Sequence, residues 1–134
     1  ESRGDRPVAP TLIDETIDFI GECALTKNLR RAKNLLQEDV PTETALSKLG
    51  TSGYVVETVA SAVYCFFRTP NDFEQTVSTA VLAGGDTDTT GAVAGAISGA
   101  WNGLDGIPSK WINGVEMSEL IMETAEKIYD LSIT

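Results

Sequence analysis

Apolar residues in this chain recur at helical spacing. Over residues 11–25 they return every three or four positions and would line one face of a helix: Ile13, Ile17, Ile20 and Ala24. Thr11, with Asp14 three residues later, resembles a capping box at the start of this helix. The same spacing predicts helices over residues 28–37, 42–49, 55–68, 90–102 and 117–131. A further helix is predicted to begin at residues 71–74. Because no stretch alternates long enough for a strand, the predicted fold class is all-α.

Two of these helices carry distinctive apolar faces. The helix over residues 55–68 is apolar nearly all round, which is typical of a helix in the centre of a bundle. The final helix has one apolar side, which we expect to face inward: Leu120, Ile121, Ala125, Ile128 and Leu131.

The helix over residues 90–102 has a row of small residues. Glycine recurs at every fourth position: Gly91, Gly95, Gly99 and Gly103. Each interior glycine costs roughly 1 kcal/mol of helix propensity relative to alanine. Such a row lets another helix backbone approach closely, and the apolar segment is too short for the membrane version of this motif. We therefore predict a tightly packed helix that holds the preceding turn rigid.

The segment before that helix concentrates oxygen donors. Asp86 and Asp88 stand two residues apart among three threonines, and Gly84-Gly85 supplies backbone freedom for a turn. Carboxylates and hydroxyls suit hard cations such as magnesium, calcium or manganese. The sequence therefore predicts a metal site with Asp86, Asp88 and Thr89 as ligands. The competing interpretation is helix capping, since Asp and Thr are favoured at helix N-termini.

Two other motifs share these letters. An EF-hand calcium loop needs a glutamate at its twelfth position, where this chain has Ile97, so that interpretation fails. Haloacid-dehalogenase phosphatases carry D-x-D-x-[TV] after a buried strand, and residues 86–90 match the letters. The residues upstream have helical rather than strand periodicity, so a phosphatase remains a weak alternative.

Composition narrows the function classes. Twenty acidic and ten basic residues give a net charge of −10, which argues against nucleic-acid binding through basic patches. The chain has no histidine, which removes the commonest general base and any histidine-based zinc site. Cys23 and Cys65 each lie among apolar residues, and we expect buried free thiols in a cytoplasmic protein, with a disulfide between them as the alternative.

The length and the hydropathy favour one soluble domain. With 134 residues the chain is at most one domain, residues 1–134, and is long enough to bury a core. No signal peptide is visible, and the longest apolar run is shorter than the roughly 20 residues that span a bilayer. The chain starts without methionine, which suggests processing or a piece of something longer.

Three segments resemble the ADP-ribosylglycohydrolases, including the dinitrogenase-reductase-activating type. They are YVVETVASAVYCFFRT at residues 54–69, LAGGDTDTTGAVAGAISGAWNG at residues 82–103, and GIP at residues 106–108. The resemblance implies a compact, orthogonal all-α bundle that binds two magnesium or manganese ions in a central cleft. It further implies a hydrolase that removes ADP-ribose from arginine or serine side chains, or acts on related ADP-ribosyl compounds.

The resemblance also assigns roles to residues. It implies metal ligation by Asp86, Asp88 and Thr89. It implies substrate contact by the Ser52-Gly53-Tyr54 turn, chiefly Tyr54, and by Gly85. Taken alone, Tyr54 is more often a core residue than a stacking platform.

One part of the family pattern is missing. The family's remaining metal ligands lie in an N-terminal Thr-Asp-Asp segment, which this sequence lacks. The resemblance therefore implies the C-terminal part of a larger domain, with an N-terminal fragment as a partner that completes the site. We assign no general base, and a catalytically inactive binding or structural module of the same fold is the alternative function.

Overall fold

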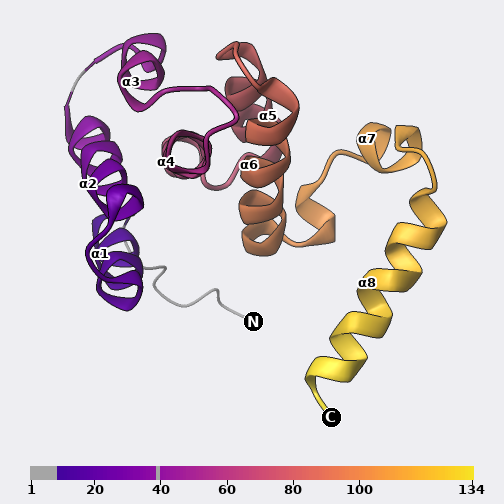
Figure 1. The fold of residues 1–134 in the computed structure, drawn as a ribbon. Coiled ribbons are helices and arrows are strands. Elements are labelled where there is room, and N and C mark those ends of the chain that lie inside the picture. Colours follow the sequence, from indigo (N-terminus) through magenta and orange to yellow (C-terminus); the bar gives the residue numbers. More distant parts are fainter. Residues whose placement is uncertain (1–8, 39) are drawn as a thin grey trace.

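The fold is that of a computed structural model, which describes residues 9–38 and 40–134. These residues form helices and no strand, which confirms the all-α prediction (Figure 1). In chain order the elements are α1 (Ala9–Ile20), α2 (Ala24–Gln37), α3 (Thr42–Leu49), α4 (Val55–Arg68), α5 (Phe73–Leu82), α6 (Thr87–Asn102), the 3-10 helix η1 (Leu104–Gly106), α7 (Ser109–Gly114) and α8 (Ser118–Ser132).

Helix α4 lies at the centre of the main body. It is seen end-on in Figure 1, between α1 and α2 on one side and α5 and α6 on the other, and it contacts α2, α3, α5 and α6. Its fully buried residues include Ala60, Ala62, Tyr64 and Cys65. The prediction that the nearly all-apolar segment forms a central helix is therefore confirmed.

A break at residues 21–23 separates the first two helices. The sequence predicts one helix over residues 11–25, but α1 ends at Ile20 because Gly21 adopts a φ of 82°. Cys23 then caps α2, whose first residue is Ala24. Ile13 and Ile17 of α1 are buried, and they form a small core cluster with Leu29 of α2.

The two cysteines differ in environment. Cys65 is a buried free thiol, as predicted, and its burial raises its pKa to about 12. Cys23 is an exposed free thiol, so the prediction of burial is wrong for this residue. The reason is the break at Gly21, which places Cys23 at the start of a helix instead of on its apolar face.

The glycine row of α6 packs directly against α5. A Cβ atom built on Gly91 would lie 2.9 Å from Val81 Cγ2, and one on Gly95 would lie 3.5 Å from Val77 Cγ2. One on Gly99 would lie 3.7 Å from Phe73 Cε2. The predicted close helix approach is confirmed, and its partner is α5.

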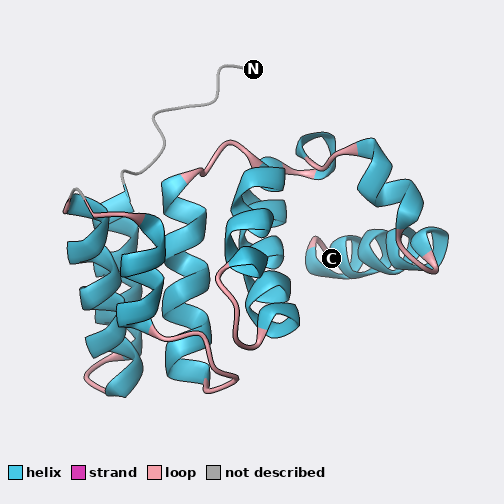
Figure 2. Ribbon diagram, turned by 90° about the horizontal axis from the view of Figure 1, so that it is seen from above, coloured by secondary structure: helices cyan, strands magenta, loops and turns pink. Residues whose placement is uncertain are grey.

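Helix α8 stands away from the main body (Figures 1 and 2). Its principal contact among the described helices is the neighbouring α7. The side predicted to face inward is exposed: Leu120 by 50%, Ile121 by 52%, Ile128 by 63% and Leu131 by 78%, with Ala125 also exposed. Helical periodicity identified the apolar side correctly, but no described surface covers it.

Among the described residues, every helix is too short or too polar to cross a bilayer.

The α5–α6 contact predicts opposite effects for two substitutions at one position. Gly95→Ala places its Cβ at an ordinary contact distance from Val77 and restores helix propensity, so we expect unchanged or slightly raised stability. Gly95→Leu overfills the same contact and should lower the free energy of unfolding by about 1–3 kcal/mol. Urea denaturation of both variants checks this, and equal stability of the two would contradict the packing described.

Candidate metal and substrate site

Two loops that are distant in sequence meet at the N-terminus of α6. The backbone N–H of Asp86 donates a 2.7 Å hydrogen bond to the carbonyl oxygen of Thr51. Gly85, immediately before it, adopts a φ of 72°, and a Cβ atom there would overlap that carbonyl group. Glycine is therefore the residue that permits this close approach.

The two acidic residues of the predicted metal site converge. Asp86 is the N-cap of α6, with φ −82° and ψ 75°, and Asp88 lies in the first helical turn. Both carboxylates accept a hydrogen bond from the backbone N–H of Thr89, at 3.4 Å from Asp86 Oδ1 and 2.9 Å from Asp88 Oδ1. The helix starts at Thr87, three residues earlier than the sequence predicts, and the carboxylates still meet because Asp86 lies outside the helix.

The electrostatics of the pair reflect this proximity. Hydrogen bonding with the Asp88 carboxyl group, followed by hydrogen bonding with Thr89, lowers the pKa of Asp86. Asp86 is half-buried and Asp88 is exposed, so the pair opens to solvent. Two adjacent carboxylates repel each other when both are ionised, and a shared cation relieves that repulsion.

The predicted substrate turn lies beside these carboxylates. A Cβ atom built on Gly53 would lie 2.5 Å from Asp86 Oδ2, so the turn backbone passes directly against the carboxyl group. Tyr54 follows as the N-cap of α4, and 57% of its surface is exposed. Tyr54 is therefore available to a ligand and is not a core residue. The structure thus brings together Ser52, Gly53, Tyr54, Gly85 and Asp86.

Sequence reasoning missed the residues that hold this turn in place. Glu57 Oε2 accepts hydrogen bonds from the Ser52 backbone N–H at 3.0 Å and from Ser52 Oγ at 2.6 Å, and these bonds lower the pKa of Glu57. Thr58 Oγ1 donates to the Ser52 carbonyl at 3.0 Å, and Ser61 Oγ donates to the Gly50 carbonyl at 2.6 Å. The available signal was a glutamate three residues into a predicted helix, where it can accept from upstream N–H groups.

The donors fit one side of a hard-cation site. Two carboxylates and the Thr89 hydroxyl are oxygen ligands of the kind that magnesium and manganese prefer. The described part of the chain contains no group of three or more histidine, cysteine, aspartate or glutamate residues placed to hold a metal ion. Metal binding by this cluster therefore remains a prediction that needs further ligands.

Comparison with known proteins identifies the family. The sequence profile of the ADP-ribosylglycohydrolases matches residues 3–134, so the chain belongs to the ADP-ribosylglycohydrolase family. It is 38% identical to an uncharacterized protein of Archaeoglobus fulgidus, over 92% of this chain and 44% of that protein. It is 31% identical to the human ADP-ribosylhydrolase ARH3, over 92% of this chain and 38% of that protein.

A bacterial relative shares a shorter region. The ADP-ribosyl-[dinitrogen reductase] glycohydrolase of Rhodospirillum rubrum is 40% identical over 50% of this chain and 22% of that enzyme. The chain thus spans less than half the length of each of these relatives. No solved structure gives a significant match.

The hydrogen bonds of Glu57 predict a pH-dependent contribution to stability. Because folding lowers the pKa of Glu57, its contribution is present above the ordinary carboxyl pKa of about 4.3 and is lost as the pH falls through the folded-state value. Glu57→Gln should therefore lower Tm at neutral pH, and the difference from wild type should shrink in acid. Thermal melts across this range check it, with Glu123→Gln on the exposed α8 as the control. A difference independent of pH would contradict this role.

Proposed function

We propose that this chain supplies half of a binuclear magnesium or manganese site in a hydrolase that removes ADP-ribose from modified protein side chains or from related ADP-ribosyl compounds. The observation that carries the proposal is the convergence of Asp86 and Asp88 beside the Ser52–Tyr54 turn. Membership of the ADP-ribosylglycohydrolase family supports the reaction class. Two relatives carry names that describe hydrolysis of ADP-ribosyl groups.

Each residue of the site has a distinct role in this proposal. Asp86, Asp88 and Thr89 would hold the divalent cations. When bound, these cations supply orientation of the ribose hydroxyls and activation of the attacking water. The exposed ring of Tyr54 would stack on the substrate, while the backbone of Ser52, Gly53 and Gly85 shapes the adjoining wall.

The chain would need a partner for catalysis. Two neighbouring cations of this type require more oxygen ligands than two carboxylates and one hydroxyl provide. We therefore propose that a segment with the remaining ligands, from an N-terminal fragment or a separate polypeptide, completes the site. The exposed apolar side of α8 supports this, because an unpartnered apolar helix face is a surface that another element can cover.

A second candidate function is a binding or structural module of the same fold that has lost catalysis. The small number of metal ligands among the described residues favours it. The phosphatase alternative is weaker still, since the element before Asp86 is the helix α5, whereas that motif follows a buried strand.

A direct assay separates these functions. The chain, combined with the polypeptide that completes it, is incubated with an ADP-ribosylated arginine peptide and with a phosphate ester, each in magnesium. We expect release of ADP-ribose from the peptide and no hydrolysis of the ester. No turnover despite bound magnesium would favour the inactive module, and hydrolysis of the ester alone would favour the phosphatase.

The role of Asp86 predicts the effect of one isosteric substitution. Asp86→Asn removes a negative ligand and should abolish ADP-ribose release in the same assay and weaken magnesium binding by at least about tenfold. Asp105→Asn in η1, away from the α6 N-terminus, is the matched control and should change neither property. Retained turnover by Asp86→Asn would remove this residue from the mechanism.

A further inference from the structure

A cavity lies beside Tyr54, the last residue of the Ser52–Tyr54 turn. It has a volume of about 360 Å³ and lies between α2, α3 and the start of α4. Its lining includes three cationic side chains, Lys27 and Arg31 from α2 and Lys48 from α3, together with Tyr54 and Glu57. In a chain with a net charge of −10, the gathering of three cations around one cavity is a departure from the overall charge.

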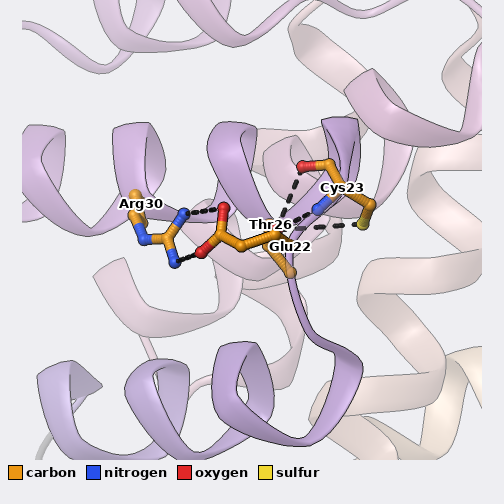
Figure 3. Close-up of polar contacts among 4 residues, drawn as sticks. All are labelled: Glu22, Cys23, Thr26 and Arg30. Atoms are coloured by element: carbon orange, nitrogen blue, oxygen red, sulfur yellow. Dashed lines mark hydrogen bonds and ion pairs between the residues drawn. The ribbon is translucent and has the colours of Figure 1, made fainter.

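Among the residues that the structure describes, none of these three cations forms an ion pair, although, alongside a hydrogen bond from Arg30, the charge of Lys27 contributes to lowering the pKa of Glu22. The ion pairs within the described residues join other side chains: Arg30 with Glu22, Lys33 with Asp14, and Lys110 with Glu74. Figure 3 shows the ion pair in which both guanidinium Nη atoms of Arg30, the residue adjacent to Arg31, donate to the Glu22 carboxylate. Within the described part of the chain, Arg31 donates a single hydrogen bond, 3.4 Å from Nη1 to the Lys48 carbonyl, and its other N–H groups have no described partner.

The one carboxylate in the lining does not cancel this charge. Glu57 Oε2 already accepts two hydrogen bonds from Ser52, which turn that oxygen toward the loop. Among the described residues of the lining, three positive groups and one negative group leave an excess of two positive charges.

A buried side chain fixes the walls of the cavity. Asn28, which is only 7% exposed, donates from Nδ2 to the carbonyl oxygens of Leu49 and Val56, both at 3.0 Å. These bonds tie α2 to the end of α3 and to the first turn of α4. The backbones that carry the three cations are therefore held in place before any ligand binds, which lowers the entropic cost of binding.

We propose that this cavity, which we call the basic pocket, binds the phosphate groups of a nucleotide. The guanidinium fork of Arg31 suits phosphate oxygens, and the two ammonium groups add positive charge. The volume lies in the range of small-ligand pockets. The exposed ring of Tyr54 at the rim offers a stacking surface for a base or a sugar, which favours a nucleotide over an acidic peptide.

The nucleotide has two possible sources with the same chemistry. One is the diphosphate of the substrate itself, since Tyr54 follows Gly53, which lies against Asp86. The other is a free nucleotide. The first assignment rests on the proposed function, whereas phosphate binding by the basic pocket does not.

The primary test is calorimetric titration of the chain with inorganic pyrophosphate in EDTA, which excludes any contribution from divalent metal. The double variant Arg31→Gln/Lys48→Gln should bind at least about tenfold more weakly than wild type. The control Arg68→Gln/Lys127→Gln makes the same change in net charge outside the pocket and should bind as wild type does. Added salt should weaken the wild-type interaction, because the cations are exposed.

Three results would overturn the proposal: no binding of pyrophosphate by wild type, equal weakening in the control, or no weakening in the double variant with its melting curve unchanged. If the double variant is unfolded, the single substitution Lys27→Gln, at an exposed position, replaces it and should still weaken binding. Asp86→Asn should retain pyrophosphate affinity even if it loses magnesium, so failure of the metal site and failure of the basic pocket are distinguishable.

A second arm identifies the source of the nucleotide. ADP in EDTA should bind more tightly than pyrophosphate, and Tyr54→Ala should remove that advantage while leaving pyrophosphate affinity unchanged. Competition between ADP and ADP-ribose supports the substrate's own diphosphate as the ligand, and simultaneous binding of both supports a free nucleotide. Equal affinity for ADP and pyrophosphate would overturn the role of Tyr54.

Discussion

The hydrogen bond from the backbone N–H of Asp86 to the carbonyl oxygen of Thr51 is the contact on which the site depends. It joins the loop before α4 to the loop before α6, and the lack of a side chain at Gly53 and Gly85 lets the two backbones come that close. The consequence is that the Asp86 carboxyl group lies directly against the Ser52–Tyr54 turn, which is remote from it in sequence.

The helices beneath these loops keep that contact in register. The glycine row of α6 packs on α5, and both helices pack on the central α4, whose first turn carries Glu57. Glu57 accepts hydrogen bonds from Ser52, and Asn28 of α2 donates to the last residue of α3 and to the first turn of α4. The glycine row in the core therefore fixes the helices that carry Glu57 and Asn28. These two polar residues hold the loop and helix ends that lie between the acidic site and the basic pocket.

The sequence predicted much of this, for identifiable physical reasons. The all-α fold and the central helix followed from apolar periodicity and are confirmed. The candidate site residues came from the Asp-Thr-Asp-Thr spacing and the family resemblance, and their roles stay predictions. The predicted end of the first helix was wrong because Gly21 ends α1, although the apolar pattern continues past it. The prediction that the apolar side of α8 faces inward was wrong, because periodicity identifies an apolar face but not the surface that covers it. Thr51 was not found, since its role uses a backbone carbonyl in a contact distant in sequence.

The central claim is that Asp86 and Asp88 bind a divalent cation at the N-terminus of α6. Crystals of the chain in complex with the polypeptide that completes the site, soaked in manganese and measured at the manganese absorption edge, test it most directly. The account predicts an anomalous peak within coordination distance of both carboxylates and of the Thr89 hydroxyl. Manganese bound elsewhere, with both carboxylates still directed only at the Thr89 amide, would contradict it.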